Sequence, residues 1–238
     1  MDSANGTKAK TNSLFESIDR KSSRNRVYDA MREAIFSGKL TPGLRLTETG
    51  LANDFDVSRV VIREALQQLA HDGLVVQNSY KGTNVVKLDS EEVNEILAVR
   101  SLLESEAIRL AMPRLTDTDR SELKRMAAEL DSTSDPSSHT ELDFAFHQRI
   151  WELSGNQTLK RILTHLSAPF FAMAVIVRQS KEHDPYAERA DIGKHTQVVE
   201  SLISGSVADA VAAMKTHIGQ NRNKVGESFD RFIGSDKQ

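Results

Sequence analysis

Residues 46–76 read LTETGLANDFDVSRVVIREALQQLAHDGLVV, and this stretch decides the fold of the N-terminal part of the chain. Its apolar residues recur at helical spacing in two blocks, which predicts a short helix over about Glu48–Phe55 and a longer one capped by Ser58. Asp56-Val57 separates them as a tight turn, and Asp72-Gly73 ends the second helix. Two helices joined by so few residues are typical of a helix-turn-helix.

The flanking sequence supplies the other parts of a winged helix-turn-helix over residues 27–86. Upstream, apolar residues at helical spacing predict a helix over 27–35, which ends before Pro42-Gly43. Downstream, apolar runs at 74–76 and 84–86 flank a polar tip, as in a β-hairpin. In this arrangement the third helix enters the major groove of DNA, so we expect that helix to read DNA.

The third predicted helix carries a polar stripe that suits contact with DNA. Arg59, Arg63 and Gln67 follow one another at four-residue spacing and therefore lie on one face. Arginines there can reach phosphates or bind a guanine edge, and the Ser58 hydroxyl can contact a phosphate. Lys81 at the hairpin tip can reach the minor groove or a phosphate. The alternative is a surface helix with solvated arginines, which the complete motif disfavours.

Composition and charge narrow the class of protein. The chain has 238 residues, no cysteine and a net charge of −3, so disulfides and thiolate metal sites are excluded. Basic residues outnumber acidic ones before residue 90, and the reverse holds after it. Segment 1–23 is polar and aperiodic, and we expect a disordered basic arm that contacts phosphates, with a solvated tail as the alternative. The N-terminus has no apolar run like that of a signal peptide. The longest apolar stretch, Pro169–Val177, is too short to span a bilayer. We therefore expect a cytoplasmic protein with no membrane partner.

From residue 89 onward the pattern is helical, and the sequence predicts an antiparallel bundle. No strand pattern interrupts this half, and its clearest break lies at 134–138. We expect helices over about 93–112, 123–130, 142–153, 158–177, 192–204 and 207–225. The predicted fold is therefore mainly α, with a DNA-binding domain at 24–88, a helical domain for ligand, metal and dimerisation at 89–228, and a tail at 229–238.

Four side chains in the helical half form a candidate metal site. Asp143 and His147 are four residues apart and share one helical face, close enough to bind one cation. His195 and His217 lie about ten and eleven residues from the Gly205-Ser206 loop, so in antiparallel helices they should have similar heights. A single histidine in an apolar pattern is more often a hydrogen-bonded core residue than a ligand, but the matched height favours this pair.

The N-terminal part resembles the GntR family of bacterial transcription regulators. The match covers GKLTPGLRLTETGLANDFDVSRVVIREALQQLAHDGLV from residue 38 and NSYKGTNVV from residue 78. Its specific features are PG before the second helix, L-A-x-x-F-x-V-S-R-x-x-I-R-E-A-L across the turn, and K-G in the wing. The resemblance implies that Ser58, Arg59 and Arg63 contact operator DNA and that Gly82 lets the wing approach the DNA backbone. Some relatives carry a basic residue where this chain has Thr49-Gly50, so base contact from that position is not implied here.

The helical half resembles the FCD ligand-binding domain of the FadR-like branch of that family, over about residues 93–219. The matching text is L-D-F-A-F-H-x-x-I-x-x-x-S-G-N-x-x-L, K-H-x-x-V-V-x-S-L-x-x-G and A-x-x-A-M-x-x-H-I. The resemblance implies that Asp143, His147, His195 and His217 bind one divalent metal. One aspartate with three histidines suits Zn²⁺, with Ni²⁺ or Mn²⁺ as alternatives, and open coordination positions would admit a small carboxylate effector.

Three further residues are candidates for effector binding. Arg100 lies in a V-R-x-L-L-E stretch like that of the first bundle helix in the family, and it can clamp a carboxylate. An i, i+4 surface salt bridge to Glu104 is the alternative reading of this residue. The other two candidates are Asn156 and Arg178.

Together these features predict a ligand-responsive transcription regulator, acting as a repressor. A homodimer formed through the helical half would place two recognition helices on the half-sites of a palindrome. An effector bound near the metal would shift the helices and change the separation of the heads. The rival is a metal-dependent hydrolase fused to a DNA-binding head, although we find no clear general base, nucleophile motif or phosphate-binding loop. A third option is an architectural DNA binder with an inert bundle.

Overall fold

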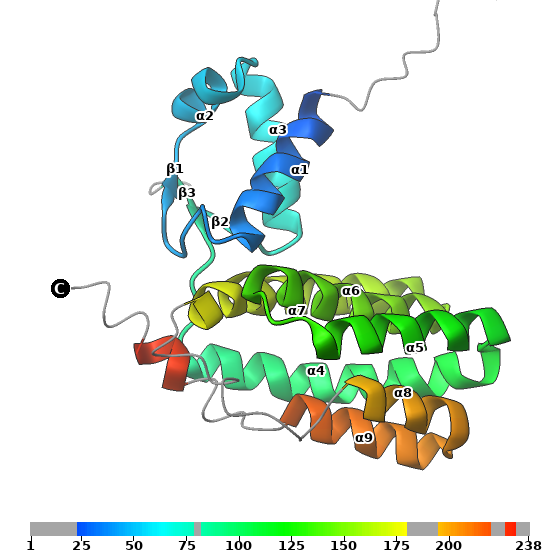
Figure 1. Cartoon of the computed structure of the whole chain (residues 1–238). Coiled ribbons are helices and arrows are strands. Elements are labelled where there is room, and N and C mark those ends of the chain that lie inside the picture. Colours follow the sequence, from blue (N-terminus) through cyan, green and yellow to red (C-terminus); the bar gives the residue numbers. More distant parts are fainter. Residues whose placement is uncertain (1–22, 79–81, 180–194, 220–226, 232–238) are drawn as a thin grey trace, which may run out of the picture.

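The computed structural model describes residues 23–78, 82–179, 195–219 and 227–231, which form a small head seated on a bundle of helices (Figure 1). The head contains α1 (Ser23–Phe36), β1 (Arg45–Leu46), α2 (Glu48–Phe55), α3 (Arg59–His71), β2 (Val75–Asn78) and β3 (Gly82–Val85). The bundle contains α4 (Ser90–Ala111), the 3-10 helix η1 (Met112–Arg114), α5 (Asp117–Ser132), α6 (Pro136–Leu153), α7 (Gln157–Gln179), α8 (His195–Ser204) and α9 (Val207–Gly219). The predicted fold, a winged helix-turn-helix followed by a helical bundle, is confirmed.

The helix-turn-helix forms where the sequence predicts it, because each of its helices has its own cap. The Thr47 hydroxyl accepts a hydrogen bond from the Gly50 backbone N–H at 3.2 Å, and the Ser58 hydroxyl accepts one from Val61 at 3.4 Å. Between them Asp56 adopts a left-handed conformation, with φ of 50°, that turns the chain. The apolar face of α3 is buried in the head through Ile62, Ala65, Leu66 and Leu69. Its polar face therefore stays exposed.

The wing is an antiparallel sheet of three strands in the order β1-β3-β2. β3 pairs with β2 in the predicted hairpin and with β1 on its other side. The sequence does not predict β1, because two residues are too few to show the alternation of a strand. Gly82 begins β3 with φ of +85°, a conformation that favours glycine. Residues 79–81 of the predicted tip of the hairpin, Lys81 among them, lie outside the described residues.

α6 is longer than predicted and begins inside the break expected at 134–138. The Asp135 carboxylate accepts a hydrogen bond from the Ser138 backbone N–H at 2.8 Å and so caps the helix. Pro136 occupies the first turn, where its fixed φ suits a helix and its missing N–H costs nothing. The proline expected to interrupt the helical pattern therefore starts a helix, and the DFAFH segment lies well inside it.

α7 is extensively buried and packs against α4, α6 and α1 of the head. Every residue from Ser167 to Val177 is buried, and the Phe171 ring packs against Phe144 of α6 with centroids 4.9 Å apart. By length and composition α7 is the one helix, among the residues described, that could cross a membrane, but 67% of its apolar window is buried inside the protein. The helix extends well beyond the apolar stretch 169–177, so shortness is no argument against a membrane span. Its apolar composition is instead explained by burial in the core.

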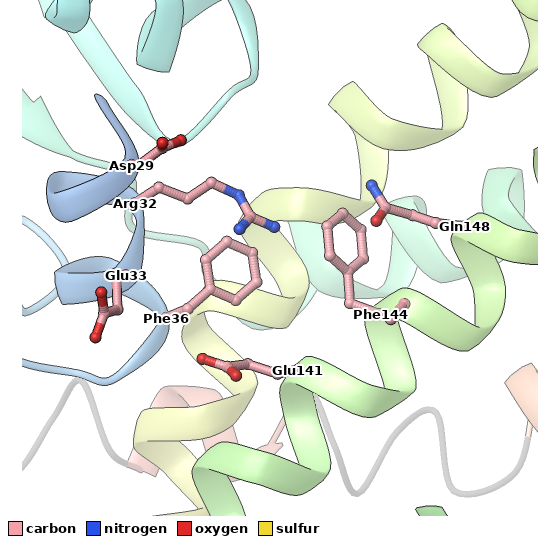
Figure 2. Close-up of a pocket in the computed structure, with 8 residues that line it drawn as sticks. Asp29, Arg32, Glu33, Phe36, Glu141, Phe144 and Gln148 are labelled. Carbon is pink, nitrogen blue, oxygen red and sulfur yellow. The ribbon is translucent and has the colours of Figure 1, made fainter. Parts of the chain in front are cut away.

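The head packs directly on α6 and α7. Phe36 at the end of α1 stacks on Phe144, with ring centroids 5.6 Å apart. After α3, Gly73 has φ of +76°, and a Cβ added there would lie 3.0 Å from the backbone oxygen of His165 in α7. Between α1 and α6 lies a cavity of about 400 Å³ whose lining includes Phe36, Phe144, Arg32 and Glu141 (Figure 2). The boundary between head and bundle thus contains both close contacts and a cavity.

The packed chain extends into the segment expected as a tail. Residues 227–231 are helical, and the buried Phe229 ring stacks on Phe170 with centroids 6.0 Å apart. The expected basic arm up to residue 22, the start of the helix predicted from 192, the end of the last predicted helix and the final residues from 232 lie outside the described residues.

Candidate metal centre and DNA-reading face

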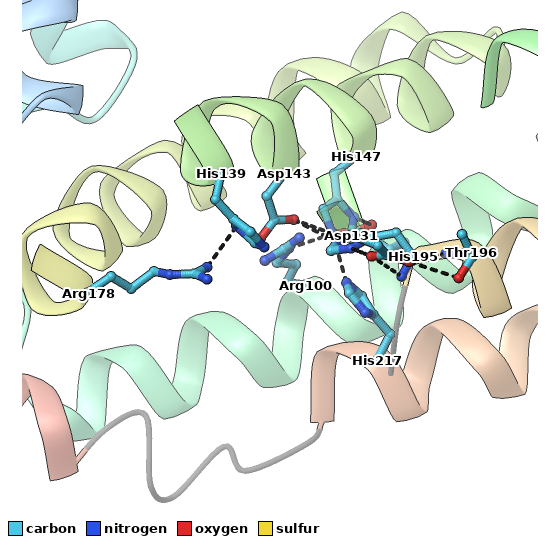
Figure 3. A network of polar contacts seen from close by, with 10 residues as sticks. Arg100, Asp131, His139, Asp143, His147, Arg178, His195, Thr196 and His217 are labelled. Atoms are coloured by element: carbon cyan, nitrogen blue, oxygen red, sulfur yellow. Dashed lines mark hydrogen bonds and ion pairs between the residues drawn. The ribbon is translucent and has the colours of Figure 1, made fainter. Parts of the chain in front are cut away.

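Four side chains meet in the bundle, and they are the four that the sequence predicts as metal ligands. One ligand atom from each of Asp143, His147, His195 and His217 lies within 4.8 Å of every other (Figure 3). The Nε2 atoms of His147 and His217 are 3.2 Å apart. The Asp143 Oδ1 atom lies 3.1 Å from His195 Nε2 and 3.3 Å from His147 Nε2. One carboxylate oxygen and three imidazole nitrogens can therefore converge on a single cation.

Helix register and the short connection between α8 and α9 bring these four side chains together. Asp143 and His147 lie on successive turns of α6, His195 is the first residue of α8, and His217 lies in the last turn of α9. The rings of His195 and His217 have centroids 4.4 Å apart, as their matched distances from the connecting loop predict. His147 and His195 are buried, whereas Asp143 and His217 are partly buried.

Two carboxylates orient the imidazoles from outside the cluster. Glu104 Oε2 on α4 lies 2.6 Å from His147 Nδ1, and Asp131 Oδ1 on α5 lies 3.0 Å from His195 Nδ1. Each ring thereby presents Nε2 to the cluster, and such carboxylate–histidine pairs fix the orientation of metal-binding imidazoles. Asp131 also accepts hydrogen bonds from the Thr196 backbone N–H and hydroxyl, at 3.1 and 2.8 Å, which anchors the start of α8. Sequence reasoning finds Glu104 only as a partner of Arg100 and misses Asp131.

The charges in the cluster are strongly coupled. Burial disfavours the charged form of Asp143, but His195 and His147 outweigh it and hold the pKa of this carboxyl well below its usual range. Burial likewise disfavours a charged His195, yet Asp143 and Asp131 raise its pKa. A metal needs the Nε2 atom of His195 without its proton, so a cation and a proton compete for this ring, and the raised pKa favours the proton.

Arg100 makes a buried ion pair, not the surface salt bridge considered from the sequence. Its Nε donates to Glu104 Oε1 at 2.5 Å, and the two side chains are 4% and 0% exposed. Burial disfavours the Glu104 carboxylate, but His147 and Arg100 together hold its pKa at about 2. The guanidinium lies over the Phe171 ring, with Cζ 4.6 Å from the centroid. Within the described part of the chain, Arg100 Nη2 has no hydrogen-bond partner, and a bound anion could supply one.

The other two effector candidates lie in different places. Arg178 at the end of α7 donates from Nη1 to His139 Nδ1 at 2.8 Å, and Figure 3 shows this pair beside Asp143. Burial and Arg178 lower the pKa of His139 to about 4, so the ring is neutral near pH 7. Asn156 instead caps α7, because its Oδ1 accepts a hydrogen bond from Leu159 N at 3.0 Å. It is exposed at the turn, and none of its described contacts reaches the cluster.

The candidate DNA contacts of α3 lie on its exposed face. Ser58 caps the helix, and Arg59, Arg63 and Gln67 project from it. Both arginines meet Glu48 at the start of α2, which sequence reasoning missed. Arg63 donates from Nε and Nη2 to the two carboxylate oxygens at 2.9 and 2.7 Å, while Arg59 Nη2 lies 3.5 Å from Oε2. Glu48 thus links the two exposed arginines across the turn between α2 and α3.

Comparisons with known proteins agree with this two-part architecture. Residues 23–85 match the model of bacterial regulatory proteins of the gntR family, and residues 95–220 match that of the FCD domain. The HTH-type transcriptional regulator YdhC of Bacillus subtilis is 32% identical over 147 residues, which cover 59% of this chain and 64% of YdhC. LutR of the same organism is 28% identical over 220 residues, covering 84% of this chain and 99% of LutR. The solved structure of E. coli McbR/YncC has the same fold, with a TM-score of 0.70 at 19% identity over 90% of this chain and 100% of that one.

These matches cover the head and most of the bundle, and they decide whether the chain is a transcriptional regulator or an enzyme. The relatives are DNA-binding transcriptional regulators, not enzymes, so the hydrolase alternative has no support. The chain belongs to the GntR family of bacterial transcriptional regulators and carries an FCD domain behind its DNA-binding head.

Proposed function

We propose that this regulator is a ligand-responsive repressor whose bundle binds one divalent metal and a small carboxylate effector. The four ligand atoms within 4.8 Å of one another are the observation that carries the proposal. The head, over residues 24–88, binds operator DNA through α3 and the wing, and the bundle, over 89–228, senses the effector. The protein acts in the cytoplasm, where bacterial DNA lies.

The residues of the cluster fit a divalent transition metal. Three imidazole nitrogens with one carboxylate suit Zn²⁺ best, and Ni²⁺ or Mn²⁺ could replace it. Glu104 and Asp131 engage Nδ1 of His147 and His195, which leaves Nε2 of each ring as the ligand atom. A bound metal supplies a positive centre with coordination positions that the four protein ligands leave open.

A carboxylate is the effector chemistry that the surroundings of the cluster favour. Arg100 is buried, and its Nη2 lacks a partner within the described part of the chain, so an anion at the cluster would satisfy that donor. Arg100 is joined to the cluster through Glu104, which accepts from Arg100 Nε at 2.5 Å and lies 2.6 Å from His147 Nδ1. Arg178, on the far side of His139, adds a second cation to this region. Asn156 has no part in this proposal, since it is exposed and caps α7.

A second copy of the chain would complete the regulator. Val99 and Leu102, one turn apart on α4, are 43% and 66% exposed, and they offer an apolar strip for pairing of two bundles. A homodimer then presents two copies of α3 to the half-sites of an operator.

α6 offers a direct route from the metal cluster to the head. It carries the proposed ligand Asp143, and the next residue, Phe144, stacks on Phe36 of α1. A shift of α6 on effector binding would therefore reach α1 without an intermediate. The cavity beside these rings gives α1 room to move (Figure 2).

Elemental analysis and a thermal-shift screen test this function. Purified protein should contain about one divalent metal per chain, and the Zn²⁺-loaded protein should melt at higher temperature with at least one small carboxylic acid. Arg100→Lys should weaken that shift, because lysine cannot reproduce the guanidinium fork, whereas Arg125→Lys on the exposed side of α5 should not. Protein that neither contains metal nor takes up Zn²⁺ would overturn the sensor assignment.

A further inference from the structure

The carboxylate of Glu48 lies where it can govern how α3 reads DNA. Glu48 is the first residue of α2, and its carboxylate spans the turn to meet both arginines of α3. Arg63 approaches with two parallel donors, Nε and Nη2, at 2.9 and 2.7 Å. This two-pronged geometry fixes the plane of the guanidinium, which a single contact would leave free to rotate.

A contribution to the stability of the head does not explain the pair of Arg63 and Glu48, because both side chains are partly exposed. The side chains of Arg63 and Glu48 are 52% and 29% exposed, and exposed ion pairs contribute little to folding. A carboxylate in the first turn of a helix is favourable on its own, but that role requires no arginine. The Arg63 pair lowers the pKa of Glu48, so the carboxylate is ionised at physiological pH.

The donors that remain on Arg63 match one edge of one base. A guanidinium has five N–H donors, and the fork on Glu48 occupies the Nε–Nη2 side. Among the residues that the structure describes, none contacts the edge formed by Nη1 and the second N–H of Nη2. Two parallel donors of this kind bind guanine O6 and N7. Thr49 and Gly50, which follow Glu48, carry no basic side chain, so the proposed base contacts of the head rest on Arg59, Arg63 and the wing.

We infer that Glu48 is a specificity-determining residue, which presents Arg63 to a guanine edge and penalises contact with phosphate alone. This rests on the proposed contact of Arg63 with DNA. The negative carboxylate repels the backbone, so sequences that offer Arg63 only phosphates bind less well. Removing that charge should therefore raise affinity for unrelated DNA while weakening preference for the operator.

Selection of bound sequences from random duplex DNA, followed by titration of the selected and scrambled duplexes at fixed salt, tests the inference. Glu48→Gln should lower the ratio of the two affinities about tenfold, with tighter binding of the scrambled duplex. Glu48→Asp should do much the same to selectivity, since it keeps the helix-end charge but is too short to hold the fork. Asp54→Asn, which removes an exposed charge at the other end of α2, should leave the ratio unchanged.

The outcomes separate the inference from the function on which it rests. Arg63→Ala should abolish the preference for guanine at the base pair that Arg63 reads, and an Arg63→Ala variant that selects the wild-type sequence would refute the proposed contact itself. If Arg63→Ala loses selectivity while both Glu48 variants, melting as wild type, keep it, the role of Glu48 is refuted. Equal gains in non-specific affinity for Asp54→Asn and Glu48→Gln would also overturn it, because net charge alone would then explain the effect.

Discussion

The head and the bundle each pair an arginine with a glutamate, but in opposite surroundings. In the head, Arg63 and Glu48 are 52% and 29% exposed, whereas in the bundle Arg100 and Glu104 are 4% and 0% exposed. An exposed pair contributes little to stability and can exchange its partner, while a buried pair that loses one member leaves a charge in the core. The same chemistry thus suits the proposed contact with DNA in the head, which must be changeable, and the proposed metal ligands in the bundle, which need a fixed frame.

The largest expected effect is the loss of the metal that the buried cluster is proposed to bind. The double variant Asp143→Ala with His195→Ala should lose all stoichiometric metal, because two of four ligand atoms disappear. Elemental analysis by mass spectrometry measures this. His139→Ala is the matched control, since this neighbouring histidine contributes no atom to the cluster. Full metal content in the double variant would remove these residues from the site.

Breaking one member of each ion pair tests the comparison itself. Glu104→Gln should lower the free energy of unfolding by about 3–5 kcal/mol, because Arg100 keeps its charge in the core without a counter-ion. Glu48→Gln should leave that free energy unchanged within error, since its partners are exposed. Denaturant titration of both variants provides the measurement. Losses of equal size would contradict the distinction between a fixed and a changeable pair.

The exposed pair should matter for DNA where it does not matter for folding. Arg63→Ala is expected to weaken operator binding about ten- to hundredfold, with an unchanged melting temperature. Fluorescence anisotropy at fixed salt measures this loss. Arg125→Ala, an equally exposed arginine paired with Glu129 on α5, serves as control and should bind DNA as wild type does. Unchanged affinity for Arg63→Ala would place DNA contact elsewhere on the head.

A smaller effect should appear in the pH dependence of the bundle. Burial and Arg178 lower the pKa of His139 to about 4 from 6.5, so between these values the unfolded chain binds a proton that the folded chain does not. Stability should therefore fall as pH drops from 6.5 towards 4, by roughly 1–2 kcal/mol at pH 5. His139→Gln should lack this part of the decline when unfolding is followed at pH 7 and pH 5. An identical decline in both proteins would mean that this histidine is not held neutral.

The sequence could predict contacts that local spacing encodes, and it missed those that depend on docking. Asp143 and His147 share a face at i, i+4, and equal distances from one loop align His195 with His217. Asp131 is 64 residues from His195, and Glu48 meets Arg63 across a turn, so no periodicity links either pair. Local sequence can also mislead: Ser134 to Ser138 predicts a break, yet Pro136, with Asp135 as cap, starts α6.

The central claim is that occupancy of the bundle controls DNA reading by the head. The most direct test measures operator affinity of the Zn²⁺-loaded protein with and without a panel of small carboxylic acids, using a DNA duplex selected by the wild-type protein. At least one acid should change the dissociation constant about fivefold or more in the wild type and leave the Asp143→Ala, His195→Ala variant unaffected. A panel that changes neither protein, or changes both equally, would contradict the account.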